Sequence, residues 1–512
     1  MRILLVIQRG TLLRFALLVP ALAERGHEVH IALAGGAPPP QTIELAEEIR
    51  ERYPSVTYGL CPARTDSESW RELAWMVRGM ADLAHNAHPR YARARGLRRR
   101  TKKHVLRPLE RGVELEPLAR RLALREGTAL AGQTDAGRSR RALERAARLE
   151  AAIPSDPAID RFVLDLRPDV VVATGTFRHV SEEVEVLKSA RRLGIPTGIF
   201  ISSWDSLTNK GALKFTPERL FVWNEAQARD AEELHLIPRD RIRLTGAHAF
   251  DDWFARRPTR TPEQLLGEVG LDASRPYLAY LCSSGTIVGV PGHRRTTSTS
   301  EGEAGFISSW VEALHASDDE RLRRMGVIVR PHPNSELDAD AIRHENVVVW
   351  PPGGAYPVAA DARADFYDTL FHSEAVVGIN TTSMIEASIV GKSVLTVLVP
   401  EFAQQTTLHF HNLLAENGGF LHVAASLDEH VEQLAGVLDE DEEGRERRGR
   451  FVEWFVRPAG IDRAAAPVAA EAIEDLAALP ADSPKGSRAL RAALTLETGL
   501  SAAHRSYRRL RA

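Results

Sequence analysis

The chain has few cysteines, few aromatic residues and no long apolar run. Cys61 and Cys282 are the only cysteines in 512 residues, which excludes a disulfide framework and a metal cluster built on cysteines, and fits a reducing compartment. Since no run of about 18 apolar residues occurs, we expect no membrane-spanning helix. The net charge of −3 excludes a generally basic protein that binds nucleic acid. The hydrophobic (44%) and charged (26%) fractions are those of a globular protein.

The N-terminal residues carry strand and helix patterns in alternation. Ile3–Ile7 is a continuous apolar run, typical of a strand buried on both faces of a parallel sheet. Apolar residues then recur at helical spacing, and Glu28–Leu33 reads as a second strand. Arg9 and Arg14 interrupt the apolar stretch, so we interpret it as the start of the fold and not as a signal peptide. This order predicts a parallel α/β sheet.

A helical segment rich in arginine and alanine, at about residues 64–150, interrupts this pattern. Residues 86–150 hold 18 lysines and arginines against 7 acidic residues, a net charge of +11 that leaves −14 for the rest of the chain. Such a segment suits the anionic surface of a membrane or a polyanionic acceptor. The alternative is a solvated helical face. We expect a cytoplasmic protein, and any contact with the inner face of the membrane would be made through 86–150.

The α/β alternation resumes at residue 170 and starts afresh after a break at 256–262. Further strands are predicted at Val170–Ala173, Thr197–Ile201, Leu220–Trp223, Ile242–Thr245, Tyr277–Leu281, Val327–Arg330, Ala375–Ile379, Ser393–Val397 and Gly419–His422. Two such series predict two Rossmann-like domains facing each other across a cleft. We place the first at 1–255, including the helical insertion, and the second at 262–455, followed by C-terminal helices and a basic tail at 456–512.

Ligands of such folds bind where strands end, and two loops of the first half qualify. Gly10 follows the first strand and would let a substrate approach the backbone; the alternative is an ordinary turn. Residues 202–211 follow Thr197–Ile201 with unusual polar density. There Asp205 is suited to accept a proton from an attacking hydroxyl, and Trp204 to stack on a sugar or base. The alternative is that Asp205 only caps a turn. Asn209 and Lys210 complete the predicted acceptor side.

In the second half, Arg330-Pro-His332-Pro-Asn334 closes a predicted buried strand. Arginine and histidine at one strand end are a pair of donors suited to a phosphate, and the prolines keep the turn extended. The alternative is a salt bridge within the loop. Ser283 and Ser284 follow the first strand of this half and are small enough to admit a diphosphate, unless they form a plain loop.

A third segment, GINTTSMIEA at 378–387, runs from a strand into a helix. Its Thr381, Thr382 and Ser383 hydroxyls would lie beside free backbone N–H groups, which favours an anion. Glu386 would accept hydrogen bonds from ribose hydroxyls, or would form a capping box with Ser383. The predicted donor side therefore comprises Arg330, His332, Asn334, Thr381, Thr382, Ser383, Glu386, Ser283 and Ser284, with Asp205 and His332 as catalytic candidates.

The sequence lacks GxSxG, P-loop and HExxH motifs, which leaves esterase, NTPase and metalloprotease chemistry without support. His409 and His411 are two residues apart, unlike the i, i+4 pair of a helical zinc site. We therefore expect neither a metal nor a bound cofactor.

RPHPN at 330–334 and TTSMIEA at 381–387 resemble motifs of bacterial polysaccharide transferases of the GT-B superfamily. These include CDP-glycerol glycerophosphotransferases, capsule transferases and sialyl- and polysialyltransferases. The resemblance covers about 1–60 and 170–455. It implies that His332, Thr382 and Ser383 hold the donor phosphates and that Glu386 binds the nucleotide ribose. The acidic base motif of polysialyltransferases is not evident, and WDSLTNKG stands in a suitable place instead.

The resemblance implies a metal-independent glycosyl- or glycerophosphate-type transferase that moves a group from a nucleotide-activated donor to a polysaccharide or lipid-linked acceptor. One alternative is a non-hydrolysing sugar-nucleotide 2-epimerase, a family that shares the fold and a similar helix start but whose catalytic acids are not evident here. Another is an inactive scaffold of the same fold.

Overall fold

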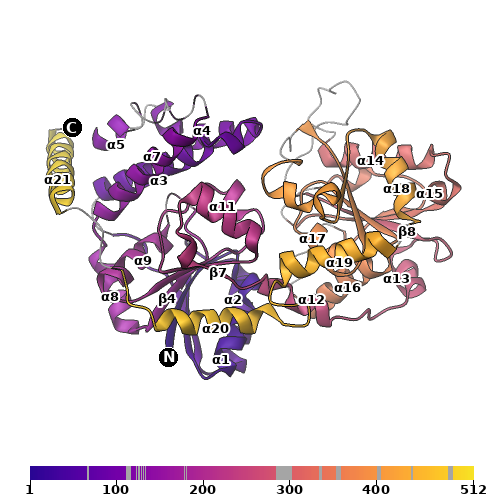
Figure 1. Ribbon diagram of the computed structural model, residues 1–512, viewed down its shortest axis with the longest axis horizontal. Coiled ribbons are helices and arrows are strands. Elements are labelled where there is room, and N and C mark those ends of the chain that lie inside the picture. The colour runs from indigo at the N-terminus through magenta and orange to yellow at the C-terminus, as the bar shows by residue number, and fades with distance from the viewer. Residues whose placement is uncertain are drawn as a thin grey trace. The chain divides into compact units, whose positions relative to one another are not determined.

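The computed structural model describes residues 1–512 except 66–67, 111–116, 123, 125–126, 128–129, 131, 133, 178, 180, 284–301, 334–336, 353–358, 401–404, 440–441, 483–487 and 512. The described chain divides into two compact units, residues 1–249 with 455–512 and residues 250–454 (Figure 1). Each unit contains one fully parallel sheet covered by helices. The predicted fold class, two Rossmann-like α/β domains, is confirmed by these two sheets.

The sheet of the first unit has seven strands in the order β3-β2-β1-β4-β5-β6-β7. The strands are β1 (Arg2–Gln8), β2 (Glu28–Ala34), β3 (Val56–Leu60), β4 (Val170–Ala173), β5 (Thr197–Phe200), β6 (Arg219–Val222) and β7 (Ile242–Leu244). Ile3–Ile7 is buried on both faces, as its unbroken apolar run predicts. The strand order reverses direction between β1 and β4, so ligands are expected at the carboxyl ends of the strands near this point.

Helices cover both faces of this sheet. One face packs on α1 (Leu18–Glu24), α2 (Pro40–Arg52) and α20 (Ala465–Ala477). The other packs on α8 (Pro157–Leu166), α9 (Glu182–Arg192), the short α10 (Ser206–Asn209) and α11 (Glu225–His235).

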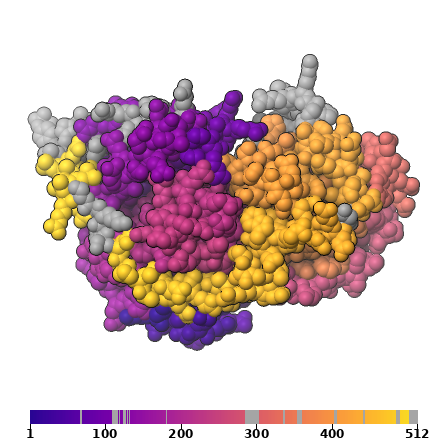
Figure 2. Space-filling model, in the orientation of Figure 1, coloured from indigo at the N-terminus to yellow at the C-terminus, as the bar shows by residue number. Residues whose placement is uncertain are grey.

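Helix α20 completes the core of the first unit, although it lies far along the chain. Ala469, Ile473 and Leu476 are fully buried against the sheet. Arg25 and His27 hold the Glu474 carboxylate at 2.6 Å and 2.7 Å. Figure 2 shows α20, in yellow, on the surface beside the indigo N-terminal segment. Residues 455–512 are thus part of the first unit, whereas the sequence offered no reason to join 456–512 to either domain.

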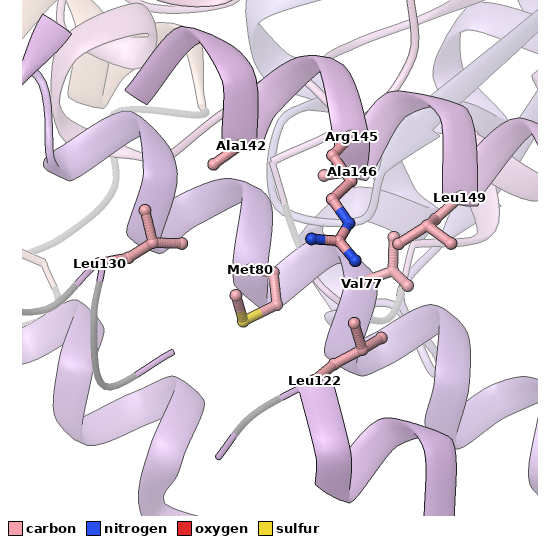
Figure 3. A pocket seen from close by; sticks show the side chains of 8 residues that line it. All are labelled: Val77, Met80, Leu122, Leu130, Ala142, Arg145, Ala146 and Leu149. Atoms are coloured by element: carbon pink, nitrogen blue, oxygen red, sulfur yellow. The ribbon is translucent and has the colours of Figure 1, made fainter. Parts of the chain in front are cut away.

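The segment at 64–150 folds as helices with a core of their own. The helices are α3 (Glu68–Asn86), α4 (Arg95–Glu110), α5 (Pro117–Leu122) and α7 (Ala136–Ala152), and α21 (Arg488–Arg511) packs beside α3 and α7. Figure 3 shows apolar side chains of α3, α5 and α7 around a small void, with Arg145 among them. Val105 and Leu106 on one side of α4 are buried in this core, and the exposed residues of α4 are mostly basic.

The sheet of the second unit has six strands in the order β10-β9-β8-β11-β12-β13. The strands are β8 (Tyr277–Leu281), β9 (Gly326–Arg330), β10 (Val347–Val349), β11 (Ala375–Gly378), β12 (Ser393–Val397) and β13 (Leu421–Ala424). Its helices are α12 (Asp251–Ala255), α13 (Pro262–Val269), α14 (Gly302–His315), α15 (Glu320–Arg324), α16 (Ala360–His372), α17 (Ser383–Ile389), α18 (Leu427–Val437) and α19 (Glu442–Val456), the last of which crosses the boundary between the units. In the described residues, no helix has the length and hydropathy needed to cross a membrane.

Candidate functional site

In the second unit, three of the predicted segments meet at one edge of the sheet. Strands β9, β8 and β11 are neighbours, and their carboxyl ends carry His332, Ser283 and the 380–386 segment. The backbone N–H of Asn380 donates to Ser283 Oγ at 3.3 Å, and the N–H of Cys282 donates to the Arg330 carbonyl at 3.0 Å. Residues about 50 and 100 positions apart are thus brought together by parallel pairing.

The segment after β11 enters α17 through a turn with several polar side chains. Thr381, Thr382, Ser383 and Glu386 are all half-buried. Thr382 is the residue that precedes the helix, and its side chain makes no capping hydrogen bond, while Thr381 Oγ1 accepts from the Ser383 N–H at 3.4 Å. The capping-box alternative required Ser383 in that place, so it does not apply. The three hydroxyls and the Glu386 carboxylate lie within two turns of one another and remain partly open to solvent.

Arg330 is directed away from this edge. Its Nη1 lies 2.6 Å from Asp365 Oδ2 on α16 and 3.2 Å from Thr369 Oγ1, and its guanidinium lies over the Phe366 ring at 5.2 Å. Trp350 Nε1 also donates to Asp365, at 3.1 Å. The guanidinium is therefore used in a buried ion pair that fixes α16 against β9. This contact is the salt-bridge alternative, although with a helix and not within the loop.

His332 faces more solvent than Arg330. It is half-buried, and burial lowers the pKa of its imidazole below the ordinary value, which favours the neutral ring at pH 7. A neutral imidazole donates one hydrogen bond and accepts another. Asn334 and Ser284, both predicted here, lie outside the described residues.

A buried carboxyl group that the sequence reasoning missed lies at the end of β8. Glu303, in the first turn of α14, accepts hydrogen bonds from the Ser283 N–H at 2.9 Å and from the Tyr280 hydroxyl at 3.2 Å. Burial raises the pKa of Glu303 to about 7, against the lowering effect of these donors. The group therefore changes charge near neutral pH, directly behind a residue of the candidate site.

In the first unit, Asp205 organises the loop after β5. Its Oδ1 accepts from Ser203 Oγ at 2.7 Å, and its Oδ2 accepts from Asn209 Nδ2 at 3.0 Å. Asp205 precedes α10, but its side chain makes no hydrogen bond to the helix backbone, so capping does not explain it. Arg14 Nη1, from the segment after β1, donates to the Ser202 carbonyl at 2.6 Å.

The other predicted acceptor-side residues differ in exposure. Gly10 is exposed at the end of β1, and a Cβ there would contact nothing within 4 Å, so the space above it is open. Lys210 is exposed and Asn209 half-buried. Trp204 has only 5% of its surface exposed, which leaves little of the ring for stacking on a sugar or base.

The helical insertion docks on these loops through buried polar side chains. Asp82 of α3 accepts hydrogen bonds from Lys214 Nζ, from His179 Nε2 and from the Ala212 N–H at 2.8 Å. Burial alone would raise the pKa of Asp82, but Lys214 and His179 outweigh it and lower the value to about 2. A Cβ on Gly211, whose φ is +96°, would collide with this carboxylate.

A second buried network joins α3 and α7 of the insertion to α9 of the sheet layer. Arg78 pairs with Glu150 at 2.8 Å and with Glu185, and Lys188 Nζ lies 3.0 Å from Glu150. On the surface, Arg100 Nη2 of α4 donates to the Asn209 backbone and side-chain oxygens, both at 3.1 Å. The insertion thus contacts the same loop that holds Asp205.

Over the part of the chain that the structure describes, no group of three or more histidine, cysteine, aspartate and glutamate side chains could hold a metal ion. The predicted donor and acceptor sides lie on different units, at the carboxyl ends of the two sheets.

Searches against known proteins give only distant similarities. No protein-family model matches the sequence, and no curated protein matches it. UDP-GlcNAc 2-epimerase from Neisseria meningitidis, bound to UDP-GlcNAc, matches with a TM-score of 0.49 and 13% identity over 93% of this chain and 99% of that chain. UDP-GlcNAc 2-epimerase from Methanocaldococcus jannaschii matches at 0.48 and 10%, over 93% and 100%. A glycosyltransferase from Rickettsia africae matches at 0.48 and 10%, over 93% and 97%. Similarities this weak carry no functional conclusion.

Proposed function

We propose that the chain is a GT-B-type transferase that takes a sugar or glycerophosphate group from a nucleotide-activated donor. The observation that carries the proposal is the convergence of Ser283, His332 and residues 380–386 on neighbouring strand ends of the second unit. Ligands of Rossmann-like domains bind at such an edge. The acceptor, a polysaccharide or a lipid-linked glycan, would meet the loop of Asp205 in the first unit.

In this proposal the residues divide the work by chemistry. The hydroxyls of Thr381, Thr382 and Ser383 and the imidazole of His332 hold the donor phosphates and stabilise the charge that develops on the leaving group. Glu386 accepts hydrogen bonds from ribose hydroxyls. Asp205, fixed by Ser203 and Asn209, accepts the proton of the attacking acceptor hydroxyl. Arg330 is left with the structural task of holding α16.

A thermal-shift panel of CMP, CDP, UMP, UDP, GDP and ADP, without and with magnesium, tests the donor site. We expect selective stabilisation by one nucleotide, indifferent to magnesium, since binding to the native state alone raises Tm. His332→Ala should lower the affinity for that nucleotide about tenfold, the loss expected for one hydrogen bond to a charged group. His344→Ala is the matched control, because His344 precedes β10 and bonds Ser308 Oγ at 2.6 Å instead. A flat panel, or equal losses in both variants, would refute the donor site.

The acceptor side is tested by turnover. Asp205→Asn keeps the shape and the contact with Ser203 but removes the base, so turnover should be lost while nucleotide affinity is unchanged. Full activity in this variant would remove Asp205 from the proposal. Incubation with UDP-GlcNAc without an acceptor separates the epimerase alternative, which alone would convert the sugar under those conditions.

A further inference from the structure

A cavity of about 730 Å³ lies within the first unit and takes no part in the proposed transfer site. Its walls come from α3, α7, α9, residues 213–216 and α21. It reaches the last turn of α9, which precedes β5, and so extends toward the edge of the sheet where the strands begin. The void of Figure 3 is a separate space, although Val77 and Ala146 line both. The volume is in the usual range for a small-molecule site.

One part of the wall is aliphatic. Leu143, Ile153, Leu213, Leu236 and several alanines of α7 line the cavity. The described lining contains two aromatic rings, the His235 imidazole and the Phe215 phenyl ring, over which the Arg191 guanidinium lies at 4.0 Å. Most of the apolar lining is therefore aliphatic, which suits an alkyl chain.

The rest of the wall is basic. Seven lysines and arginines line the cavity against four acidic residues. Three of these cations pair with carboxylates outside the lining: Arg78 with Glu185, Arg191 with Glu218 and Lys214 with Asp82. Lys188 and Arg192 pair with Glu150 and Asp160 at 3.0 Å and 2.6 Å. Among the described residues, no carboxylate pairs with Arg148 or with Arg491. Arg148 is exposed and donates from Nε to the Glu144 carbonyl at 3.3 Å, whereas Arg491 Nε is a buried donor without a hydrogen-bond acceptor. A buried donor of this kind is costly unless something accepts from it.

We propose that this cavity binds a single-chain amphiphile with an anionic head group, with the head at Arg148 and Arg491 and the alkyl chain along the aliphatic wall. A carboxylate or a phosphate monoester supplies an acceptor for the Arg491 Nε–H and a counter-charge for these two guanidinium groups. A fatty acid and a lysophospholipid of the phosphatidate type both have this chemistry.

Titration calorimetry of the full chain with oleate and with 1-oleoyl-lysophosphatidate, below their micelle concentrations, tests the site. We expect saturable one-to-one binding of at least one of them, and the ligand that binds identifies the head group. Neutral mono-oleoylglycerol, which has the same chain, should bind at least about tenfold more weakly, because charge-assisted hydrogen bonds contribute more than neutral ones.

Two kinds of variant locate the site. The double variant Arg148→Gln with Arg491→Gln should lower the affinity for the anionic lipid about tenfold or more. Arg140→Gln, at an exposed position of α7 that does not line the cavity, should leave this affinity unchanged. Ala147→Trp, which fills the space from α7, should also weaken binding, and Ala136→Trp, at the exposed start of α7, is its control. Absence of saturable binding, equal affinity for the neutral lipid, or equal losses in target and control variants would each overturn the proposal.

Discussion

Removal of the Asp82 carboxylate is the sharpest test of how the insertion is attached to the sheet. In Asp82→Asn the buried Lys214 ammonium loses its carboxylate, and His179 and the Ala212 N–H face an amide in its place. Breaking one partner of a buried ion pair costs about 3–5 kcal/mol, because the other charge stays buried without compensation. The variant should therefore loosen α3 from the loop at 211–214.

The pH dependence gives an independent estimate of the same contact. The pKa of Asp82 is lowered from 3.8 to about 2, so the folded state binds its proton less tightly than the unfolded state. The stabilisation is complete above about pH 4 and is lost as the pH falls from about 4 to about 2. The shift corresponds to about 2 kcal/mol. Asp82→Asn should lack this part of the acid destabilisation.

Hydrogen–deuterium exchange of α3 reports on this contact without involving the second unit. A loss of 3–5 kcal/mol corresponds to a drop in protection of about 10²-fold to several thousand-fold wherever α3 exchanges through global unfolding of its unit. Asp165→Asn, at an exposed position of α8, is the control and should leave protection unchanged. Wild-type protection of α3 in Asp82→Asn would refute the view that this buried cluster holds the insertion.

Three further predictions concern the sites themselves. Arg100→Gln should lower kcat several-fold at unchanged nucleotide affinity, because Arg100 braces Asn209 and through it Asp205; Arg99→Gln is the matched control, and equal kcat in the two variants would contradict the bracing role. Between pH 4.5 and 7 the raised pKa makes the folded state hold the Glu303 proton more tightly than the unfolded state, so the second unit should lose stability as the pH rises through this range. Glu303→Gln should lessen this loss, and a urea-denaturation profile that the substitution leaves unchanged over that range would contradict the prediction. The full chain should co-sediment with anionic liposomes at low salt and be released at high salt if the basic side of α4 meets a membrane surface; absence of binding at low salt removes the membrane role.

Much of the fold could be predicted because buried parallel strands have a simple sequence pattern. Val170–Ala173, Tyr277–Leu281 and Ser393–Val397 have the predicted bounds, and most other strands differ by one or two residues. Strands β3 and β10 were missed. Val56–Leu60 carries polar and glycine positions and so shows no continuous apolar run, and Val347–Val349, although apolar, is only three residues long and half-buried.

The candidate site could be predicted only in part, because a sequence motif does not say where a side chain points. Arg330 stands in the expected place at the end of β9, yet its guanidinium turns to Asp365 on a helix that no local pattern connects to it. Asp82 was missed although a signal existed. Arg78, Asp82 and His85 follow one another at helical spacing on α3, among apolar neighbours, and such a polar stripe indicates a buried network.

The central claim is that the nucleotide donor lies at the carboxyl edge of the second sheet. Hydrogen–deuterium exchange with and without the nucleotide that gives the largest thermal shift tests this claim most directly. We predict that new protection is concentrated in the segments around Ser283, His332 and residues 380–386. Protection confined to the first unit, or no change in these three segments at a saturating nucleotide concentration, would contradict the account.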